Sequence, residues 1–327
     1  FQLVVSTALC LAVEPFSESS LFHLGIRNVK YERPLYVGDT IRSKLRIDAV
    51  RIVSNGKMRV VETSLFVLNQ HDEQVASMQR DSMFPVSVSS EDFRSNKKYS
   101  SSGGEKYVSP DEEARSTILK DLLVTNRHRA DHFLPHQPSL EKGDLLFHTL
   151  ARPLGLSTSL NQSILYKNTH PLHTYASRYD NGNGLVACGG FIIPLVLGIA
   201  SREIRFGLHE EIIDTMHINP VHHEDCIGAM SFVMEHEKKD LNNGDEAHSK
   251  TSDGRERTME CLTIRTFGVK NIDIENALEK IQIPLELVES RECKPREIEH
   301  LCKAHVPVLE GKICSRTTWK VWRYVYK

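Results

Sequence analysis

Long apolar runs, paired cysteines and an excess of charge of either sign are all missing from this sequence of 327 residues. The longest apolar run ends at Arg202 and Glu203, short of the roughly 18 residues that a membrane-spanning helix needs, so we expect no membrane insertion. The net charge of −2 gives no general attraction to nucleic acid. Composition is that of an ordinary globular protein, with 40% hydrophobic and 26% charged residues, and the length predicts two domains.

The cysteines are seven in number and include no Cys-x-x-Cys pair. An odd, scattered set favours free thiols over a disulfide scaffold, and therefore an intracellular, reducing compartment. The seven are Cys10, Cys188, Cys226, Cys261, Cys293, Cys302 and Cys314.

One stretch of the chain, residues 166–199, combines a polar turn with the signal of a buried helix. The turn from Tyr166 to Ala176 holds two histidines and a proline. The wholly apolar segment Gly189–Ile199 follows within about 20 residues, a pattern typical of a loop held over a buried central helix.

The polar turn resembles the hydratase signature of the MaoC-like (R)-specific enoyl-CoA hydratases, which reads Gly-Asp-x-Asn-Pro-Leu-His. Pro171, Leu172 and His173 agree with this signature. Asn168 stands where the family has its catalytic aspartate, and His170 stands where it has asparagine. The family has the hot-dog fold, in which an antiparallel sheet wraps a long helix, so the resemblance implies that the apolar segment is such a helix.

An internal repeat supports the same fold. The segment Arg33–Ile41 recurs as Asn219–Ile227 at an offset of 186 residues, and each copy follows an apolar segment of helix length. We therefore expect an α+β protein with a double hot-dog fold, two antiparallel sheets each wrapping a central helix, with the first repeat incomplete at its N-terminus. The matched pairs include Pro34 with Pro220 and Asp39 with Asp225.

The predicted organisation has four parts, and alternating apolar residues predict the strands within the two repeats. Asn55-Gly56 predicts a hairpin turn in the first repeat, and Ile281–Val288 is expected to be a strand of the second. The parts are a first repeat at 1–88 that lacks its opening strand and loop, a flexible linker at 89–139 with a helix at about 110–124, a second repeat at 140–293 with an insertion at 238–257, and a basic, aromatic extension at 294–327.

The C-terminal extension carries eight Lys or Arg and three Glu, a net charge of +5. Both tryptophans of the protein, Trp319 and Trp322, alternate there with basic residues. This pattern fits an edge strand laid on its own domain, and it also fits a surface at 315–327 that docks onto a protein or RNA partner.

Hydration of a trans-2-enoyl thioester needs a base that activates water, an acid for the α-carbon and a donor for the thioester oxygen. The resemblance places the histidine of this chemistry at His173. Asn168 occupies the aspartate position, and an amide cannot accept a proton at neutral pH. Asp180 lies nearby in the sequence, but its spacing does not identify it as a substitute. The implied site residues are His173 and Asn168 for catalysis and Gly189, Gly190 and Tyr175 for substrate binding.

Two functions are compatible with these residues, and an active hydro-lyase and a pseudoenzyme are about equally favoured. The first is an enoyl-thioester hydratase or dehydratase homologue with a degraded catalytic pair, whose substrate is an acyl-CoA or acyl-carrier-protein thioester. The second is a catalytically inactive scaffold subunit of a large protein or ribonucleoprotein assembly, for which a mitochondrial location is favoured over a peroxisomal or cytoplasmic one. Neither requires a cofactor. No metal site is predicted, because Pro135 interrupts the four-residue spacing of His128, His132 and His136.

Overall fold

The structure of the protein is a computed structural model that describes residues 2–88, 121, 140–175, 184–204, 207–239, 257–278, 282–290 and 293–326. Most of the predicted linker helix, most of the predicted insertion and Asp180 lie outside these residues, and Asp121 of that predicted helix is helical. The chain forms two compact units. Unit 1 comprises 1–118 and 155–191, and unit 2 comprises 119–154 and 192–327.

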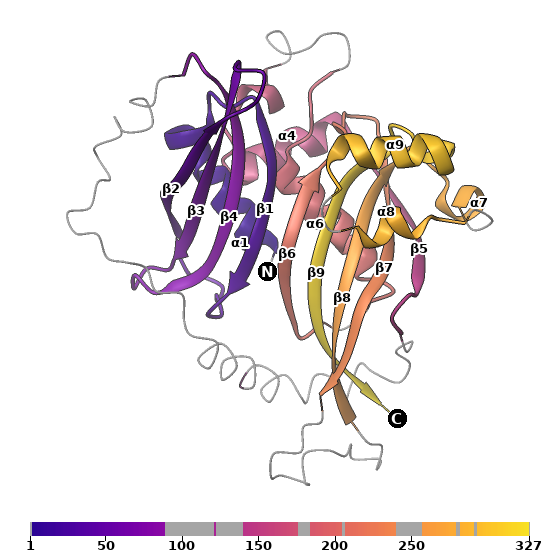
Figure 1. Cartoon of the computed structure of the whole chain (residues 1–327). Helices are drawn as coiled ribbons and strands as arrows, with labels where there is room; N and C mark the ends of the chain where they lie inside the picture. The colour runs from indigo at the N-terminus through magenta and orange to yellow at the C-terminus, as the bar shows by residue number, and fades with distance from the viewer. Residues whose placement is uncertain are drawn as a thin grey trace. The chain divides into compact units, whose positions relative to one another are not determined.

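The N-terminal part of unit 1 consists of a helix and an antiparallel sheet (Figure 1). Its elements are α1 (Gln2–Leu11), β1 (Phe22–Tyr31), β2 (Arg42–Ile52), β3 (Met58–Leu68) and β4 (Gln74–Pro85). The strands lie in the order β2-β3-β4-β1, and α1 packs on β2 and β3. Leu65, Met78 and Phe84 are buried in this sheet, so burial of one apolar face holds the unit together.

The predicted hairpin between β2 and β3 is confirmed. Gly56 has a φ of +68° and donates its amide hydrogen to the carbonyl oxygen of Val53 at 2.8 Å. Strand β2 lies at the end of the strand order and is mostly exposed, which suits its charged residues Arg46, Asp48 and Arg51.

Helix α1 ends in a π-helical turn, η1 (Val13–Ser17). Pro15 lies in this turn and has no backbone N–H to offer the carbonyl of Leu11, so the α-helical bonding pattern cannot continue through it. The turn brings Ser17 into the buried interior of unit 1.

Unit 2 has a five-stranded antiparallel sheet in the order β6-β9-β8-β7-β5 (Figure 1). The strands are β5 (Leu145–Pro153), β6 (His209–His217), β7 (Cys226–Lys239), β8 (Arg257–Lys270) and β9 (Ile313–Tyr326). Helix α6 (Gly189–Ala200) is almost wholly apolar, and the boundary between the units falls in its first turn. Val196 of α6 packs on Gly268 of β8, so the predicted central helix lies against its own sheet.

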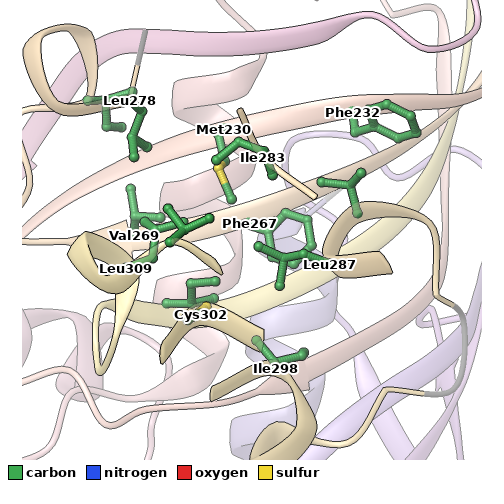
Figure 2. Close-up of a cluster of buried hydrophobic side chains, with 14 residues drawn as sticks. Met230, Phe232, Phe267, Val269, Leu278, Ile283, Leu287, Ile298, Cys302 and Leu309 are labelled. Carbon is green, nitrogen blue, oxygen red and sulfur yellow. The ribbon is translucent and has the colours of Figure 1, made fainter. Parts of the chain in front are cut away.

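A layer of short helices covers the opposite face of this sheet. Side chains alternate along β8, so Gly268 faces α6 while Phe267 and Val269 face the other side. There they meet α7 (Ile274–Leu278), α8 (Leu285–Glu289), α9 (Pro295–His305) and the 3-10 turn η5 (Pro307–Leu309) in one apolar cluster (Figure 2). The cluster comprises Met230, Phe232, Phe267, Val269, Ile274, Leu278, Ile283, Leu287, Val288, Ile298, Cys302, Val306, Leu309 and Ile313.

The expectation of a strand at 281–288 is wrong, because α8 begins at Leu285. Leu287 and Val288 are adjacent in the sequence and both buried. In a strand adjacent side chains would point to opposite faces, whereas on one helical turn both pack onto the sheet.

The expectation of an edge strand or docking surface at 315–327 is also corrected. Strand β9 pairs with β6 on one side and with β8 on the other, so it is an interior strand. Trp319 and Trp322 are 1% and 6% exposed. Two of its basic residues are internal as well: Arg323 donates to Glu260 at 2.5 Å, and Arg316 donates to Asp214 at 3.4 Å.

The predicted repeat is visible in the turn that precedes β2 and β7. Gly38 and Glu224, which are 186 residues apart, both have a left-handed backbone, with φ of +101° and +72°. In the first copy the carboxylate of Asp39 accepts the amide hydrogen of Tyr36 at 2.8 Å. In the second copy Asp225 accepts that of His222, also at 2.8 Å. The aspartate is therefore the residue that closes the turn in both copies.

A chain of hydrogen bonds crosses the buried inner face of unit 2. Trp319 Nε1 donates to Thr266 Oγ1 at 2.9 Å, and Thr266 and Ser231 hydroxyls lie 2.8 Å apart. His148 joins Ser231 through Nε2 at 2.8 Å and Glu203 through Nδ1 at 2.7 Å. A carboxylate only accepts hydrogen bonds and an indole N–H only donates them. In this series of hydrogen bonds, each hydroxyl and the imidazole therefore donate toward Glu203. Burial lowers the pKa of His148, which suits this neutral arrangement.

Candidate functional site

The polar turn begins where helix α4 (Leu156–Leu165) ends. Lys167 has a left-handed backbone with φ of +56°, and its amide bonds to the carbonyl of Ile164 at 3.0 Å. The next amide, that of Asn168, bonds to the carbonyl of Ser163 at 2.8 Å. These two bonds form a Schellman motif, which fixes the direction in which the chain leaves the helix.

Asn168 is 7% exposed and uses both ends of its side-chain amide. Its Oδ1 accepts the backbone N–H of His170 at 3.0 Å. Its Nδ2 donates to the sulfur of Cys188 at 2.9 Å. The amide therefore shapes the turn and holds a thiol sulfur.

His170 anchors the turn to another part of unit 1. Its Nδ1 accepts the backbone N–H of Leu172 at 3.2 Å, so the ring proton is on Nε2, which donates to the carbonyl of Ser20 at 2.9 Å. Burial lowers the pKa of His170, and the positive charge of Arg80 lowers it further. The residue is a neutral structural histidine.

His173 lies in the short 3-10 turn η3 (Pro171–His173) and is partly buried. Its Nδ1 lies 2.7 Å from the carbonyl oxygen of Val186. A carbonyl only accepts, so Nδ1 carries the proton and Nε2 keeps its lone pair. This is the tautomer that a general base requires.

Cys188 immediately precedes α6 and is buried. Besides the amide of Asn168, its sulfur accepts hydrogen bonds from the backbone N–H of Gly190 and from the thiol of Cys10 on α1. The pKa of Cys188 is lowered, first by the Cys10 thiol and then by the two N–H donors. The pKa of Cys10 is raised, first by its bond to Cys188 and then by burial.

Arg80 on β4 completes the surroundings of the two thiols. Its side chain is 5% exposed, and its Nη2 donates to Ser17 Oγ at 3.0 Å. Its Nε and Nη1 have no hydrogen-bond partner in the described part of the chain. Burial lowers the pKa of Arg80 to about 10, and the two groups whose charge opposes this are Cys10 and Cys188.

Of the three predicted substrate-binding residues, two lie at the start of α6 and the third is exposed. Gly189 and Gly190 open α6, as the resemblance implies, but the amide of Gly190 is bonded to the sulfur of Cys188. Tyr175 is 56% exposed, at the end of a described range. The structure thus gathers His173, Asn168 and the start of α6, and it does not bring Tyr175 to them.

Three members of this site were not identified by the sequence reading: Cys10, Cys188 and Arg80. Two signals were available. Cys188 directly precedes the Gly-Gly start of an apolar helix, and thiols at helix N-termini are often reactive. Arg80 falls in the buried phase of β4 together with Met78 and Phe84, an unusual position for a charged side chain.

Within the described ranges, no three His, Cys, Asp or Glu side chains are grouped so that they could hold a metal ion. The predicted histidine spacing at 128, 132 and 136 falls outside those ranges. None of the helices in the described part of the chain has the length and apolarity to cross a membrane.

Sequence comparison matches part of the chain to a family model. Residues 5–78 match the model for the dehydratase domain region of FAS1-like proteins. The matched residues run from α1 into β4 and do not include the polar turn. A search among curated proteins finds no match to the chain.

Structure comparison extends the resemblance to the whole chain. A protein of Chloroflexus aurantiacus named as a MaoC domain dehydratase superposes with a TM-score of 0.65 and 18% identity, over 99% of this chain and 81% of its own. A conserved Mycobacterium tuberculosis protein with a double hot-dog fold superposes with a TM-score of 0.59 and 14% identity, over 98% of this chain and 81% of its own. This protein therefore has the double hot-dog fold, and its resemblance to the MaoC-like dehydratases is confirmed.

Proposed function

We propose that this protein binds acyl thioesters of CoA or acyl carrier protein in a MaoC-like site that has largely lost its hydratase activity. One observation carries the proposal. Asn168 stands at the aspartate position of the signature. Its Nδ2 donates a hydrogen bond to the sulfur of Cys188, and its Oδ1 accepts one from the backbone N–H of His170. The fold shared with a protein named as a dehydratase supports the substrate class.

The chemistry of hydration explains the loss. Asn168 cannot accept the proton of an attacking water, which leaves Nε2 of His173 as the basic atom of the signature turn. The resemblance assigns the amide of Gly189 or Gly190 to the thioester oxygen, and the Gly190 amide is engaged by Cys188. Loss of one acid or base group alone costs about a hundredfold to ten-thousandfold in rate.

Hydration of crotonyl-CoA by the purified chain tests the chemical half of the proposal. We expect the wild type to be close to the uncatalysed rate. Asn168→Asp should raise the rate by about a hundredfold or more, because it supplies the missing base. Adding Cys188→Ala, which frees the Gly190 amide, should raise the rate further. His173→Ala should abolish the gained activity. Efficient turnover by the wild type would overturn this half.

Binding is tested separately with butyryl-CoA, a saturated thioester that cannot be hydrated. Isothermal titration calorimetry should detect binding by the wild type and by Asn168→Asp alike. Asp180→Asn is the control for a substitute carboxylate, and it should change neither binding nor rate. Absence of butyryl-CoA binding would overturn the proposed function.

A scaffold subunit of a larger, mitochondrial, protein or ribonucleoprotein assembly is the second candidate, and the same use of Asn168 favours it. Strand β9 no longer supports it, because the side chains expected to dock are internal. The size of the native complex separates the candidates: a particle of many subunits, purified from mitochondria and unable to bind butyryl-CoA, would favour the scaffold.

A further inference from the structure

Two cysteines from distant parts of the sequence meet in the interior of unit 1. A methyl group on Gly190 would lie 3.6 Å from the sulfur of Cys188 and 4.0 Å from that of Cys10. The two residues pack with Tyr166 in one buried cluster, and both are free thiols. Their contact brings α1 and the start of α6 together through sulfur.

The two sulfurs have different surroundings. The sulfur of Cys188 receives hydrogen bonds from Asn168 Nδ2, from the backbone N–H of Gly190 and from the thiol of Cys10. It also lies at the N-terminus of α6, a helix of 12 residues, where the helix dipole favours negative charge. The N–H donors and the helix N-terminus favour negative charge on Cys188.

Arg80 supplies an independent sign of an anion at this position. Arg80 is 5% exposed, and two of its guanidinium nitrogens have no hydrogen-bond partner in the described residues. Such a guanidinium is costly to bury unless a negative charge compensates it. The groups that compensate it electrostatically are the two thiols, with no carboxylate among them. A thiolate on Cys188 would supply that charge.

We propose that Cys188 and Cys10 form a peroxide-sensitive thiol pair, in which Cys188 is the reacting thiolate and Cys10 is the resolving thiol. The thiolate attacks one oxygen of hydrogen peroxide, the O–O bond breaks, and Cys188 becomes a sulfenic acid while the other oxygen leaves as water after protonation. The sulfur of Cys10 then attacks the sulfenic sulfur, the S–O bond breaks, and the products are a disulfide and a second water. Two thiols are oxidised and one peroxide is reduced to two waters.

Oxidation would alter the polar turn as well as the thiols. A Cys10–Cys188 disulfide links α1 covalently to the residue that opens α6. It also removes the thiolate that faces Arg80 and weakens the acceptor held by Asn168. The pair is therefore a modification site coupled to the turn, whether or not acyl thioesters bind there.

Peptide mapping of the intact chain under non-reducing conditions, after titration with hydrogen peroxide, tests the proposal. We expect a linked peptide that contains Cys10 and Cys188 and has lost two hydrogens, and reduction with dithiothreitol should reverse it. Cys226 and Cys293 are partly exposed, so accessibility alone predicts that they react first. Oxidation of Cys226 or Cys293 by peroxide before Cys188 has reacted would overturn the proposal.

Single variants separate the two roles. Cys10→Ser should accumulate a sulfenic acid on Cys188 that dimedone traps, whereas Cys188→Ser should leave Cys10 unmodified. Cys314→Ser is the matched control, a buried thiol whose pKa is raised to about 12, and it should form the Cys10–Cys188 link like the wild type. Trapping on Cys10 rather than Cys188 would overturn the assigned roles.

Two further variants test the electrostatic support. Arg80→Met should slow the oxidation of Cys188 by about tenfold or more, and Arg80→Lys should retain most of the rate, because thiolate formation needs a nearby cation. If Arg80→Met does not fold, Asn168→Leu removes an N–H donor from the same sulfur and should slow the reaction in the same direction. Unchanged rates in every folded variant would overturn the proposal.

Discussion

The hydroxyl group of Ser6 on α1 donates a hydrogen bond to the carbonyl oxygen of Gly190 in the first turn of α6. This carbonyl has no donor within its own helix, because the residue four positions later is Pro194, which lacks an N–H. A proline in one helix thus creates the acceptor that a second helix, 184 residues away in the sequence, uses for docking.

Ser6→Ala should lower the free energy of unfolding by about 1–3 kcal/mol, because it leaves the buried Gly190 carbonyl without a donor. Adding Pro194→Ala should recover most of the loss, since alanine restores the helical N–H donor. Urea denaturation of the two single variants and the double variant gives the coupling energy. Thr7→Ala is the control: its exposed hydroxyl bonds only within α1, and we expect a change within about 0.5 kcal/mol. Additive effects of Ser6→Ala and Pro194→Ala would contradict this account.

Gly268 is needed for the close approach of α6 to β8. A Cβ atom there would lie 2.6 Å from Ser315 Oγ and 2.7 Å from Val196 Cγ2. Gly268→Ala should therefore destabilise unit 2 by about 1–3 kcal/mol through overpacking. Gly198→Ala, in α6 with no atom within 4 Å of the added carbon, should stabilise the protein by about 0.5–1 kcal/mol through helix propensity. Thermal unfolding of both variants measures the contrast, and equal effects would refute it.

Glu260 links β8 to β9 inside unit 2. It is 1% exposed and accepts from Arg323 at 2.5 Å and from His236 at 2.8 Å. Glu260→Gln leaves a buried guanidinium without its counter-charge and should cost about 3–5 kcal/mol of stability. Glu310→Gln, which breaks an exposed pair with Lys303, should cost less than about 1 kcal/mol. Chemical denaturation compares the two, and a small effect at Glu260 would argue against an interior β9.

Acid should destabilise unit 1 through His170. Burial lowers the pKa of His170 in the folded chain, so as the pH falls below about 6.5 the unfolded chain binds a proton that the folded chain does not. Stability should therefore decrease between neutral pH and the folded pKa, and it should be independent of this group above neutrality. His170→Gln keeps an N–H donor for Ser20 without titrating, so the slope of unfolding free energy against pH should flatten. A slope unchanged from the wild type would exclude His170 as its source.

Local patterns in the sequence predicted the elements with strong periodicity. The apolar segment Gly189–Ile199 corresponds to α6, and Asn55-Gly56 forms its hairpin. The helix and the hairpin both depend on interactions between residues close in sequence, so local sequence patterns predict them. The expected strand at 281–288 failed because a short apolar run has the same composition in a buried helical turn as in a strand.

The candidate site was predicted in part, and the reason is again physical. The signature identified His173 and Asn168, and the chain brings both to the start of α6. The partners Cys10 and Arg80 come from α1 and β4, and no local pattern connects them to the turn. Which groups face a buried amide is decided by packing across the unit, so the role of Asn168 could not be read from its position.

The sequence by itself determined that two similar helix-and-sheet repeats exist and that the second carries a signature turn without its aspartate, because repeats, periodicity and residue chemistry are properties of residue order. Only the tertiary structure decided that the basic, aromatic tail is an interior strand and that the asparagine holds a thiol. Strand pairing and buried contacts join residues that are far apart in the chain, and their energy exists only once both partners have been brought together.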